Sequence, residues 1–390
     1  MDPVRNPFAP GAGTSPPELT GRGDILERAR ITLGRILIGN PSKSLMIVGL
    51  RGVGKTVLLN KIQEMAEKKG YEAFLVEANE GKALPALLLP PLRRILLSLD
   101  RRAQVDDLVK RGLRVLRSFA NSVHLTVGEI DVGMDMEPEI GVADSGDLDA
   151  DLHALIIAIG EAARSQKTAI AIMIDELQYL KESEFSALIK SLHYVAQKNL
   201  PVTMIGAGLP QLVGLSGRSK SYSERLFDYP EVGALAFEDA RAALVEPVRR
   251  EGADFDENAV EEIFHITQGY PYFLQEWGYH AWNVSEKEHI EASVLKRATE
   301  SAIRSLDESF FRVRFDRLTP REKAYMHTMA RLGPGPHRSG DISEEMGVGV
   351  KSVAPVRGSL IAKGMAYSPA HGDIAFTVPL FDQFLRRTMG

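Results

Sequence analysis

The segment that most constrains this chain is a glycine-rich stretch after an apolar run. Residues 45–48 (LMIV) lead into residues 49–56 (GLRGVGKT), which match the pattern G-x-x-x-x-G-K-[ST]. Residues 57–66 then place apolar side chains at helical spacing. A strand, a glycine-rich turn and a helix in this order predict a phosphate-binding loop.

The residue types in this loop suit a nucleoside triphosphate. Glycines let consecutive backbone N–H groups turn toward a phosphate, and the helix that follows adds the positive end of its dipole. Lys55 is predicted to reach the β- and γ-phosphates, and the Thr56 hydroxyl to bind Mg²⁺. The sequence therefore predicts ATP and Mg²⁺ as ligands. The predicted nucleotide-binding residues of the loop are Gly49, Arg51, Gly52, Val53, Gly54, Lys55, Thr56 and Val57.

A second acidic motif lies about 120 residues downstream. Residues 169–176 (AIAIMIDE) form an apolar run that ends in two carboxylates, as is typical of a strand buried in a parallel sheet. Asp175 is predicted to order the hydration of Mg²⁺, and Glu176 to polarise the attacking water. The alternative is a buried strand that ends in surface carboxylates. Together with the phosphate-binding loop, the pair favours an ATPase.

Further apolar runs predict the rest of the sheet. Tyr71–Val76, Val202–Gly206 and Val232–Phe237 alternate with helical segments such as residues 183–198. This alternation predicts an α/β fold with a doubly wound parallel sheet.

Composition limits the class of protein. With 390 residues and 44% hydrophobic side chains the chain has room for two or three domains. No apolar run approaches the roughly 18 residues that span a bilayer, and the chain has no cysteine. We therefore expect a cytoplasmic protein without a membrane partner. From Phe311 onward 12 Lys/Arg stand against 7 Asp/Glu, a net +5, so the first 310 residues carry −10.

Four segments together resemble the origin-recognition-like AAA+ and STAND P-loop ATPases. They are residues 16–22 (PPELTGR), 49–56 (GLRGVGKT), 174–180 (IDELQYL) and 269–271 (GYP), and the resemblance covers about residues 16–300. It implies an ATPase in which Gly21 and Arg22 pack beside the adenine and ribose. The alternative for this segment is an ordinary proline-rich turn before a helix.

The same resemblance assigns two further residues. Pro271 would stand in the turn of a helical lid that closes over the nucleotide, against the alternative of aromatic side chains that only pack a helical core. Arg225 would be an arginine finger that reaches the γ-phosphate in a neighbouring subunit. The alternative for Arg225 is a solvated or salt-bridged surface residue.

The chain also departs from these relatives. Residues 206–208 (GAG) supply no polar side chain at the place of the first γ-phosphate sensor, where Gln211 or Thr203 are the possible substitutes. No arginine occupies the place of the second sensor. Both absences favour slow turnover and a switch over a motor.

Two segments carry no recognisable chemistry. Residues 1–16, rich in proline and glycine, predict an extended arm. Within an insertion at about 86–150, residues 86–118 predict an amphipathic basic helix and residues 123–142 a hairpin. The basic helix has either a solvated face or a partner-binding face.

The C-terminal segment predicts three helices and two strands. The helices are Pro320–Arg331, Ser339–Met346 and Val353–Lys363, with Pro355 in the first turn of the third. The strands are Met365–Ser368 and Ile374–Val378. The segment resembles the winged helix appended to the same ATPases, which implies double-stranded DNA as a partner, or alternatively protein docking. The DNA-binding residues so implied are Lys351, Ser352, Arg357 and Lys363, with His371 near phosphates.

These interpretations define four domains and two functions. The expected domains are an arm (1–24), a P-loop ATPase domain (25–237), a helical lid (238–310) and a winged helix (311–390). One hypothesis is a switch that binds and hydrolyses ATP and controls assembly and DNA engagement through its nucleotide state. The other is a STAND-type signalling or defence ATPase whose winged helix makes autoinhibitory protein contacts. Partners are ATP or ADP, DNA, and a second copy or another protein.

Overall fold

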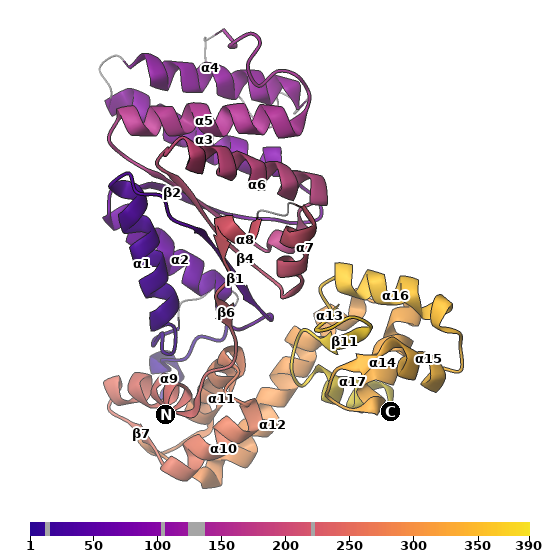
Figure 1. The fold of residues 1–390 in the computed structure, drawn as a ribbon. Helices are drawn as coiled ribbons and strands as arrows, with labels where there is room; N and C mark the ends of the chain where they lie inside the picture. The colour runs from indigo at the N-terminus through magenta and orange to yellow at the C-terminus, as the bar shows by residue number, and fades with distance from the viewer. Residues whose placement is uncertain (12–15, 103–105, 124–136, 220–222) are drawn as a thin grey trace.

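The structure, a computed structural model, describes residues 1–11, 16–102, 106–123, 137–219 and 223–390. Figure 1 shows a central sheet with a stack of helices above it, a helical region below it, and a C-terminal module to one side. None of the helices in these ranges is both long enough and apolar enough to cross a membrane.

The sheet is parallel, as predicted. Its order is β2-β3-β4-β1-β5, and β6 also pairs with β1. The apolar runs of the sequence form the four long strands. The strands are β1 (Ser44–Gly49), β2 (Glu72–Glu77), β3 (Ile170–Asp175), β4 (Val202–Gly208), β5 (Phe227–Asp228) and β6 (Glu231–Val232).

The strand expected at Val232–Phe237 is wrong in extent. Only Glu231–Val232 pairs with β1. The chain then leaves the sheet, because the backbone N–H of Leu235 donates to the carbonyl of Gly269 at 2.8 Å, and helix α9 begins at Phe237.

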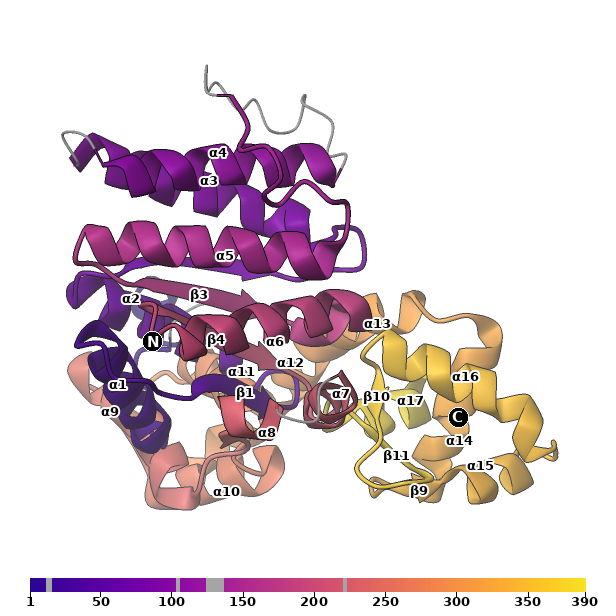
Figure 2. The same ribbon diagram turned by 45° about the horizontal axis from the view of Figure 1, so that its top comes forward.

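Alternating side chains of the strands enter two hydrophobic cores. Leu45 and Ile47 pack with α1 (Gly23–Leu37) and α2 (Lys55–Lys68), whereas Met46 packs on the opposite face. Both faces are covered, which explains why the strands read as continuous apolar runs. The opposite face carries α3 (Leu84–Arg102), α5 (Leu148–Ser165) and α6 (Glu182–Gln197), the last of which was predicted at 183–198. Figure 2 shows α5 lying between the sheet and the outer helices.

The insertion contains two helices where one was predicted. α3 is followed by α4 (Asp107–Ser122), which begins where the Asp106 carboxylate accepts hydrogen bonds from two backbone N–H groups. Its arginines are partly paired: Arg111 binds Glu161 at 3.0 Å, and Arg114 binds Glu139 at 2.7 Å. The surface is therefore less basic than the sequence suggests. Most of the predicted hairpin, at 124–136, lies outside the described residues.

The lid region is helical, and the N-terminus packs against it. The ring of Phe8 is buried against Gly278, and the Asn6 amide donates to the carbonyl of Tyr279 at 3.0 Å. The first residues are therefore held on the lid. The lid elements are α9 (Phe237–Arg250), β7 (Asp254–Phe255), α10 (Glu257–Thr267), α11 (Pro271–Val284), β8 (His289–Ile290) and α12 (Leu295–Ser305).

The C-terminal module contains the predicted helices and strands with shifted bounds. After a π-helical turn (Leu306–Phe311) come α13 (Arg312–Asp316), α14 (Pro320–Leu332), β9 (His337–Arg338), α15 (Ser339–Glu345), α16 (Val350–Ala362), β10 (Ala366–Tyr367), β11 (Asp373–Phe376) and α17 (Phe381–Met389). β9 adds a strand that sequence reasoning missed. The placement of Pro355 in the first turn was wrong, because α16 begins three residues earlier than expected, after Gly349.

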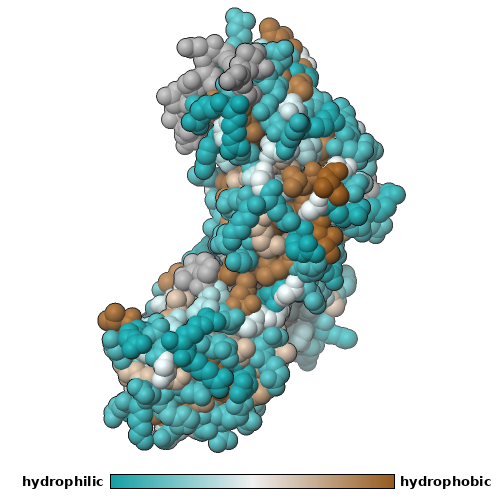
Figure 3. Space-filling model, turned by 90° about the vertical axis from the view of Figure 1, so that its left-hand side faces the viewer, coloured by the Kyte–Doolittle hydropathy of each residue, from teal (hydrophilic) through white to brown (hydrophobic). Residues whose placement is uncertain are grey.

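One face of the molecule carries a gathering of apolar side chains. In Figure 3, brown side chains gather midway along the face that faces left in Figure 1, and teal ones cover most of the rest. Helix α1 lies on this side, and its exposed apolar residues include Ile31 and, beside its C-terminal end, Ile38.

Candidate nucleotide-binding site

The loop between β1 and α2 has the backbone of a phosphate cradle. Gly52 and Gly54 have φ values of 79° and 93°, a region that side chains disfavour. At Gly49 a Cβ would lie 2.2 Å from the carbonyl oxygen of Val232, so glycine is required for β6 to approach β1. Helix α2 begins at Lys55 and points its N-terminal backbone N–H groups at the loop.

The predicted lysine, threonine and aspartate come together at the carboxyl ends of the strands. The Thr56 hydroxyl donates to the Asp175 carboxylate at 2.5 Å. The Lys55 ammonium donates to the carbonyls of Gly49 and Leu50 at 3.1 and 2.8 Å, both in its own loop. A buried ammonium held only by carbonyls is ready to accept an anion.

Burial governs the ionisation of these groups. It lowers the pKa of Lys55, while the nearby carboxylates of Glu176 and Asp175 raise it. Burial also raises the pKa of Asp175, against the lowering effect of the Thr56 hydrogen bond. Both shifts have burial as their main cause, and in such a water-poor site interactions with phosphate are strengthened.

Glu176 stands in a strained backbone conformation beside the loop. Its φ of 53° is left-handed, which is uncommon for a residue other than glycine. Arg51 lies 3.7 Å from its carboxylate, and the Gln178 amide donates to the same carboxylate. Sequence reasoning missed Gln178, which only its position two residues after the acidic pair could have suggested.

The missing first sensor has a steric explanation. A Cβ at Gly206 would lie 2.2 Å from Leu177, and a Cβ at Gly208 would lie 2.8 Å from Gln178. The turn after β3 therefore fills this space. Thr203 is no substitute, because its hydroxyl lies 3.5 Å from that of Ser44 near the other end of β4, roughly 16 Å from Gly208. The Gln211 side-chain oxygen is buried without a partner among the described residues.

A cavity of about 400 Å³ opens above the loop. The loop, the N-terminal segment, the lid and the C-terminal junction all contribute to its wall. Its lining residues include Glu18, Arg22, Arg51, Gly52, Val53, Gly54, Lys55, Thr56, Val57, Glu176, Pro271, Tyr272, Phe310 and Arg314.

The N-terminal segment is fixed to the loop by Arg22. Its buried guanidinium donates to the carbonyls of Gly233 at 2.6 Å and Val53 at 3.3 Å, and burial lowers its pKa. Gly21 has φ 63° and packs against Asp239 and Leu235. Arg22 therefore lines the cavity, and its guanidinium is hydrogen-bonded to backbone carbonyls. Its place beside the adenine and ribose stays a prediction.

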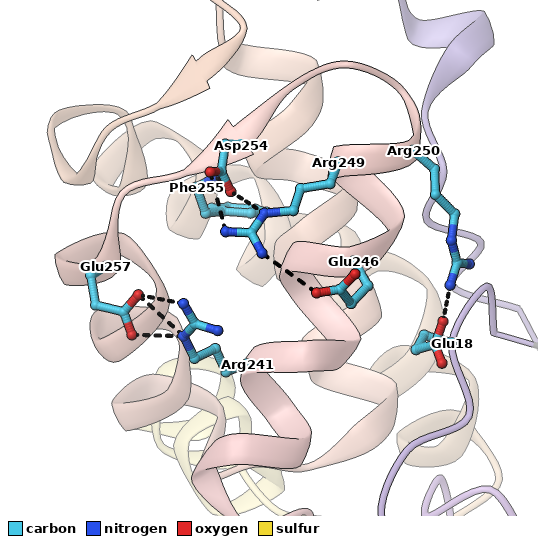
Figure 4. A network of polar contacts seen from close by, with 8 residues as sticks. All are labelled: Glu18, Arg241, Glu246, Arg249, Arg250, Asp254, Phe255 and Glu257. Carbon is cyan, nitrogen blue, oxygen red and sulfur yellow. Dashed lines mark hydrogen bonds and ion pairs between the residues drawn. The ribbon is translucent and has the colours of Figure 1, made fainter.

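One salt bridge of α9 also holds the same segment. Arg250 pairs with Glu18, one of the cavity-lining residues. Figure 4 shows this pair beside two further arginines of α9. Arg249 pairs with Asp254 at 3.2 Å, and Arg241 with Glu257 at 2.9 Å.

The lid turn touches the loop directly. The Tyr272 N–H donates to the carbonyl of Gly52 at 3.2 Å, and Pro271 lines the cavity. A Cβ at Gly52 would lie 3.1 Å from the ring of Tyr270, so this glycine also permits the close approach of the lid turn to the loop.

Arg225 does not join this site. It is exposed on the short helix α8 (Ser223–Leu226) and does not line the cavity. A role toward a neighbouring copy stays a prediction.

The site fits ATP and Mg²⁺ by its donors. The loop presents backbone N–H groups and Lys55 to phosphates, and Thr56 with Asp175 presents the oxygens that Mg²⁺ prefers. Within the described ranges no three or more His, Asp or Glu are grouped to hold a metal by themselves. Mg²⁺ commonly takes one or two protein ligands together with phosphate oxygens.

These features define a P-loop nucleoside triphosphatase: a parallel sheet, a glycine-rich loop before a helix, an acidic pair two strands away and a helical lid. Residues 18–205 match the model of the AAA ATPase domain family, so this part of the chain is an AAA ATPase domain. Residues 308–385 match a domain of unknown function, DUF8462. No curated protein sequence matches the chain significantly.

Solved structures show the same fold along the chain. The Walker-type ATPase PABY2304 of Pyrococcus abyssi is 15% identical with a TM-score of 0.60, over 94% of this chain and 96% of that one. Cdc6p from Pyrobaculum aerophilum is 13% identical with a TM-score of 0.50, over 99% and 97%. The chain thus shares its fold with this Walker-type ATPase and with Cdc6p.

Proposed function

We propose that this ATPase is a switch in which the nucleotide controls how the C-terminal module engages double-stranded DNA and how copies of the chain assemble. One observation carries the proposal. Arg51 of the phosphate-binding loop lies beside Glu176 and also donates to the carbonyl of Gly364 in the C-terminal module, at 3.3 Å. One side chain therefore touches the ATPase site and the module.

The proposed ATPase roles follow from the contacts of each residue. Lys55 binds the β- and γ-phosphates, and Thr56 with Asp175 holds Mg²⁺. Glu176 polarises the attacking water. Mg²⁺, when bound there, would neutralise part of the charge that develops on the phosphates.

We propose that the C-terminal module is a winged helix in which α16 is the DNA-reading helix. Support comes from its three helices and small sheet, and from its net charge of +5 beyond residue 310. Of the four predicted DNA-binding residues, Lys351 is exposed at the start of α16.

The other three residues make contacts within the module. Arg357 donates to Ser368 and to the carbonyl of Asp373, both at 2.8 Å, and Lys363 binds Glu322 at 2.8 Å. The Ser352 hydroxyl accepts from Arg321 at 3.1 Å. These contacts favour structural roles, so Lys351 is the residue on which the DNA proposal is tested.

The test is a salt titration of binding to duplex DNA with ATP and with ADP. We expect the logarithm of affinity to fall steeply with the logarithm of salt, and affinity to differ about 5- to 150-fold between the nucleotides. Lys351→Gln should reduce the salt slope by about one. Lys296→Gln, an exposed lysine on α12, is the matched control and should leave the slope unchanged.

An affinity for duplex DNA that changes with neither the salt concentration nor the bound nucleotide would contradict the DNA proposal. That result would point instead to protein contacts made by the module.

A further inference from the structure

A cation from the C-terminal junction lies in the nucleotide cavity. Arg314, on α13, lines the same cavity as Lys55, Thr56 and Glu176, although it stands about 260 residues after the loop. Its guanidinium lies 3.8 Å from the centre of the Phe310 ring and donates to the Phe310 carbonyl at 2.7 Å. Phe310 in turn stacks on Tyr272 of the lid turn.

No carboxylate holds this guanidinium. Among the described residues, no Asp or Glu forms an ion pair with Arg314, whereas Arg51 lies 3.7 Å from Glu176. Burial, together with the nearby charge of Arg51, lowers the pKa of Arg314 to about 10. A half-buried cation near a second cation is costly unless an anion joins them.

The phosphate end of the cavity lacks other sensors. Residues 206–208 (GAG) leave no polar side chain at the carboxyl end of β4, and α11 contains no arginine. Arg314 lies over the Phe310 ring, which stacks on Tyr272, and the Tyr272 N–H donates to the carbonyl of Gly52. These contacts put Arg314 beside the phosphate-binding loop.

We propose that Arg314 contacts the γ-phosphate of bound ATP and thereby reports the nucleotide state to the C-terminal module. This inference rests on the proposed ATP site. An arginine that meets a phosphate forms charge-assisted hydrogen bonds and recovers the favourable interactions that burial removed.

The π-helical turn Leu306–Phe311 and α13 connect the cavity to the C-terminal module. Phe310 and Arg314, four residues apart, face the cavity. Phe311 and Phe315, also four apart, pack against Phe384 of α17 with ring centres at 5.4 and 5.7 Å. One face of this turn therefore lines the nucleotide cavity, and the other face packs in the C-terminal module.

The test compares affinities for a non-hydrolysable ATP analogue and for ADP, both with Mg²⁺, by equilibrium titration. Arg314→Gln should weaken the analogue about tenfold to a hundredfold and change ADP affinity less than about threefold. Arg314→Lys, which keeps the charge but not the fork of donors, should lose less affinity for the analogue than Arg314→Gln. Arg312→Gln, exposed on the same helix, is the matched control and should change neither affinity.

Equal weakening of both nucleotides, or no change in either, would overturn the inference. If Arg314→Gln does not fold, Arg314→Lys decides by the same comparison, because the analogue alone should be weakened. Failure of the ATP site itself is distinguishable. In that case the unmodified chain would not bind the analogue, or Lys55→Ala would bind it as tightly as the unmodified chain, before Arg314 is changed.

Discussion

At the scale of single residues, Glu176 is the group on which proposed hydrolysis depends. Its left-handed backbone and its contacts with Arg51 and Gln178 hold the carboxylate at the edge of the cavity. Glu176→Gln should bind ATP within about threefold of the unmodified chain and hydrolyse it about 100- to 10,000-fold more slowly, because the amide cannot accept a proton. Phosphate release and nucleotide titration measure the two effects.

Glu182→Gln is the control for this prediction, since Glu182 is exposed at the start of α6 and outside the cavity. An unchanged hydrolysis rate in Glu176→Gln would remove Glu176 from the reaction.

Sequence reasoning located the residues whose role is encoded locally. Lys55 and Thr56 lie in one contiguous motif, and Asp175 ends a buried strand, so their neighbourhood follows from the fold. Gln178 and Arg314 could not be found in this way. Arg314 gains its role from the packing of a helix about 260 residues away from the loop, which no local pattern records.

At the scale of elements, the turn after β3 and the strand β4 fit each other closely. Gly206→Ala should destabilise the fold by about 1–3 kcal/mol, because the new Cβ would lie 2.2 Å from Leu177. In a chain that already carries Leu177→Ala, Gly206→Ala should lower the free energy of unfolding by less, because the smaller side chain leaves room for the new Cβ. Denaturant unfolding of the single and double variants measures the coupling.

Gly34→Ala in α1 is the control, because open space surrounds that position. Additive losses in the Gly206 and Leu177 variants would refute the steric account of the missing sensor.

The start of α14 carries a pH-dependent contribution to stability. Burial acts to raise the pKa of Glu322, but hydrogen bonds from Lys363, Ser359 and Thr319 outweigh it and lower the pKa to about 2. The folded pKa is below the ordinary value of 4.5, so the stabilisation is present above pH 4.5 and is lost as pH falls toward about 2.

Glu322→Gln should therefore lower the stability of the chain by about 1–3 kcal/mol at pH 7 and by progressively less below pH 4.5. Thermal unfolding followed across this pH range measures the difference. A constant difference from pH 7 to pH 3 would contradict the account.

At the scale of the whole molecule, Arg51 joins the ATPase domain to the C-terminal module. A Cβ at Gly364 would lie 2.6 Å from the guanidinium of Arg51, so the two parts are in close contact. Arg51→Ala should leave DNA binding in place and reduce the difference between its ATP-bound and ADP-bound affinities, because the side chain that links the sites is gone. Duplex binding at fixed salt with each nucleotide measures this difference.

A difference in affinity that survives the removal of Arg51 would mean that the coupling runs through other contacts. The junction packing of Phe311 and Phe315 would then be the next candidate.

The overall architecture was predictable where the sequence is periodic. The parallel sheet follows from apolar runs such as 169–174, and the C-terminal helices follow from caps such as Thr319. Two contacts were not predictable, because they depend on how separately folded parts pack. They are the docking of the N-terminus on α11 and the contact between residues 51 and 364. The predicted strand at 232–237 failed for the same reason, since the carbonyl of Gly269 takes the Leu235 N–H.

The most direct test of the central claim is hydrogen–deuterium exchange with and without ATP and Mg²⁺, in the unmodified chain and in Lys55→Ala. The account predicts that ATP slows exchange in four separate segments, at residues 49–57, 17–22, 270–275 and 310–314, and that Lys55→Ala abolishes this protection. Protection confined to other parts of the chain, or the same protection in Lys55→Ala, would contradict it.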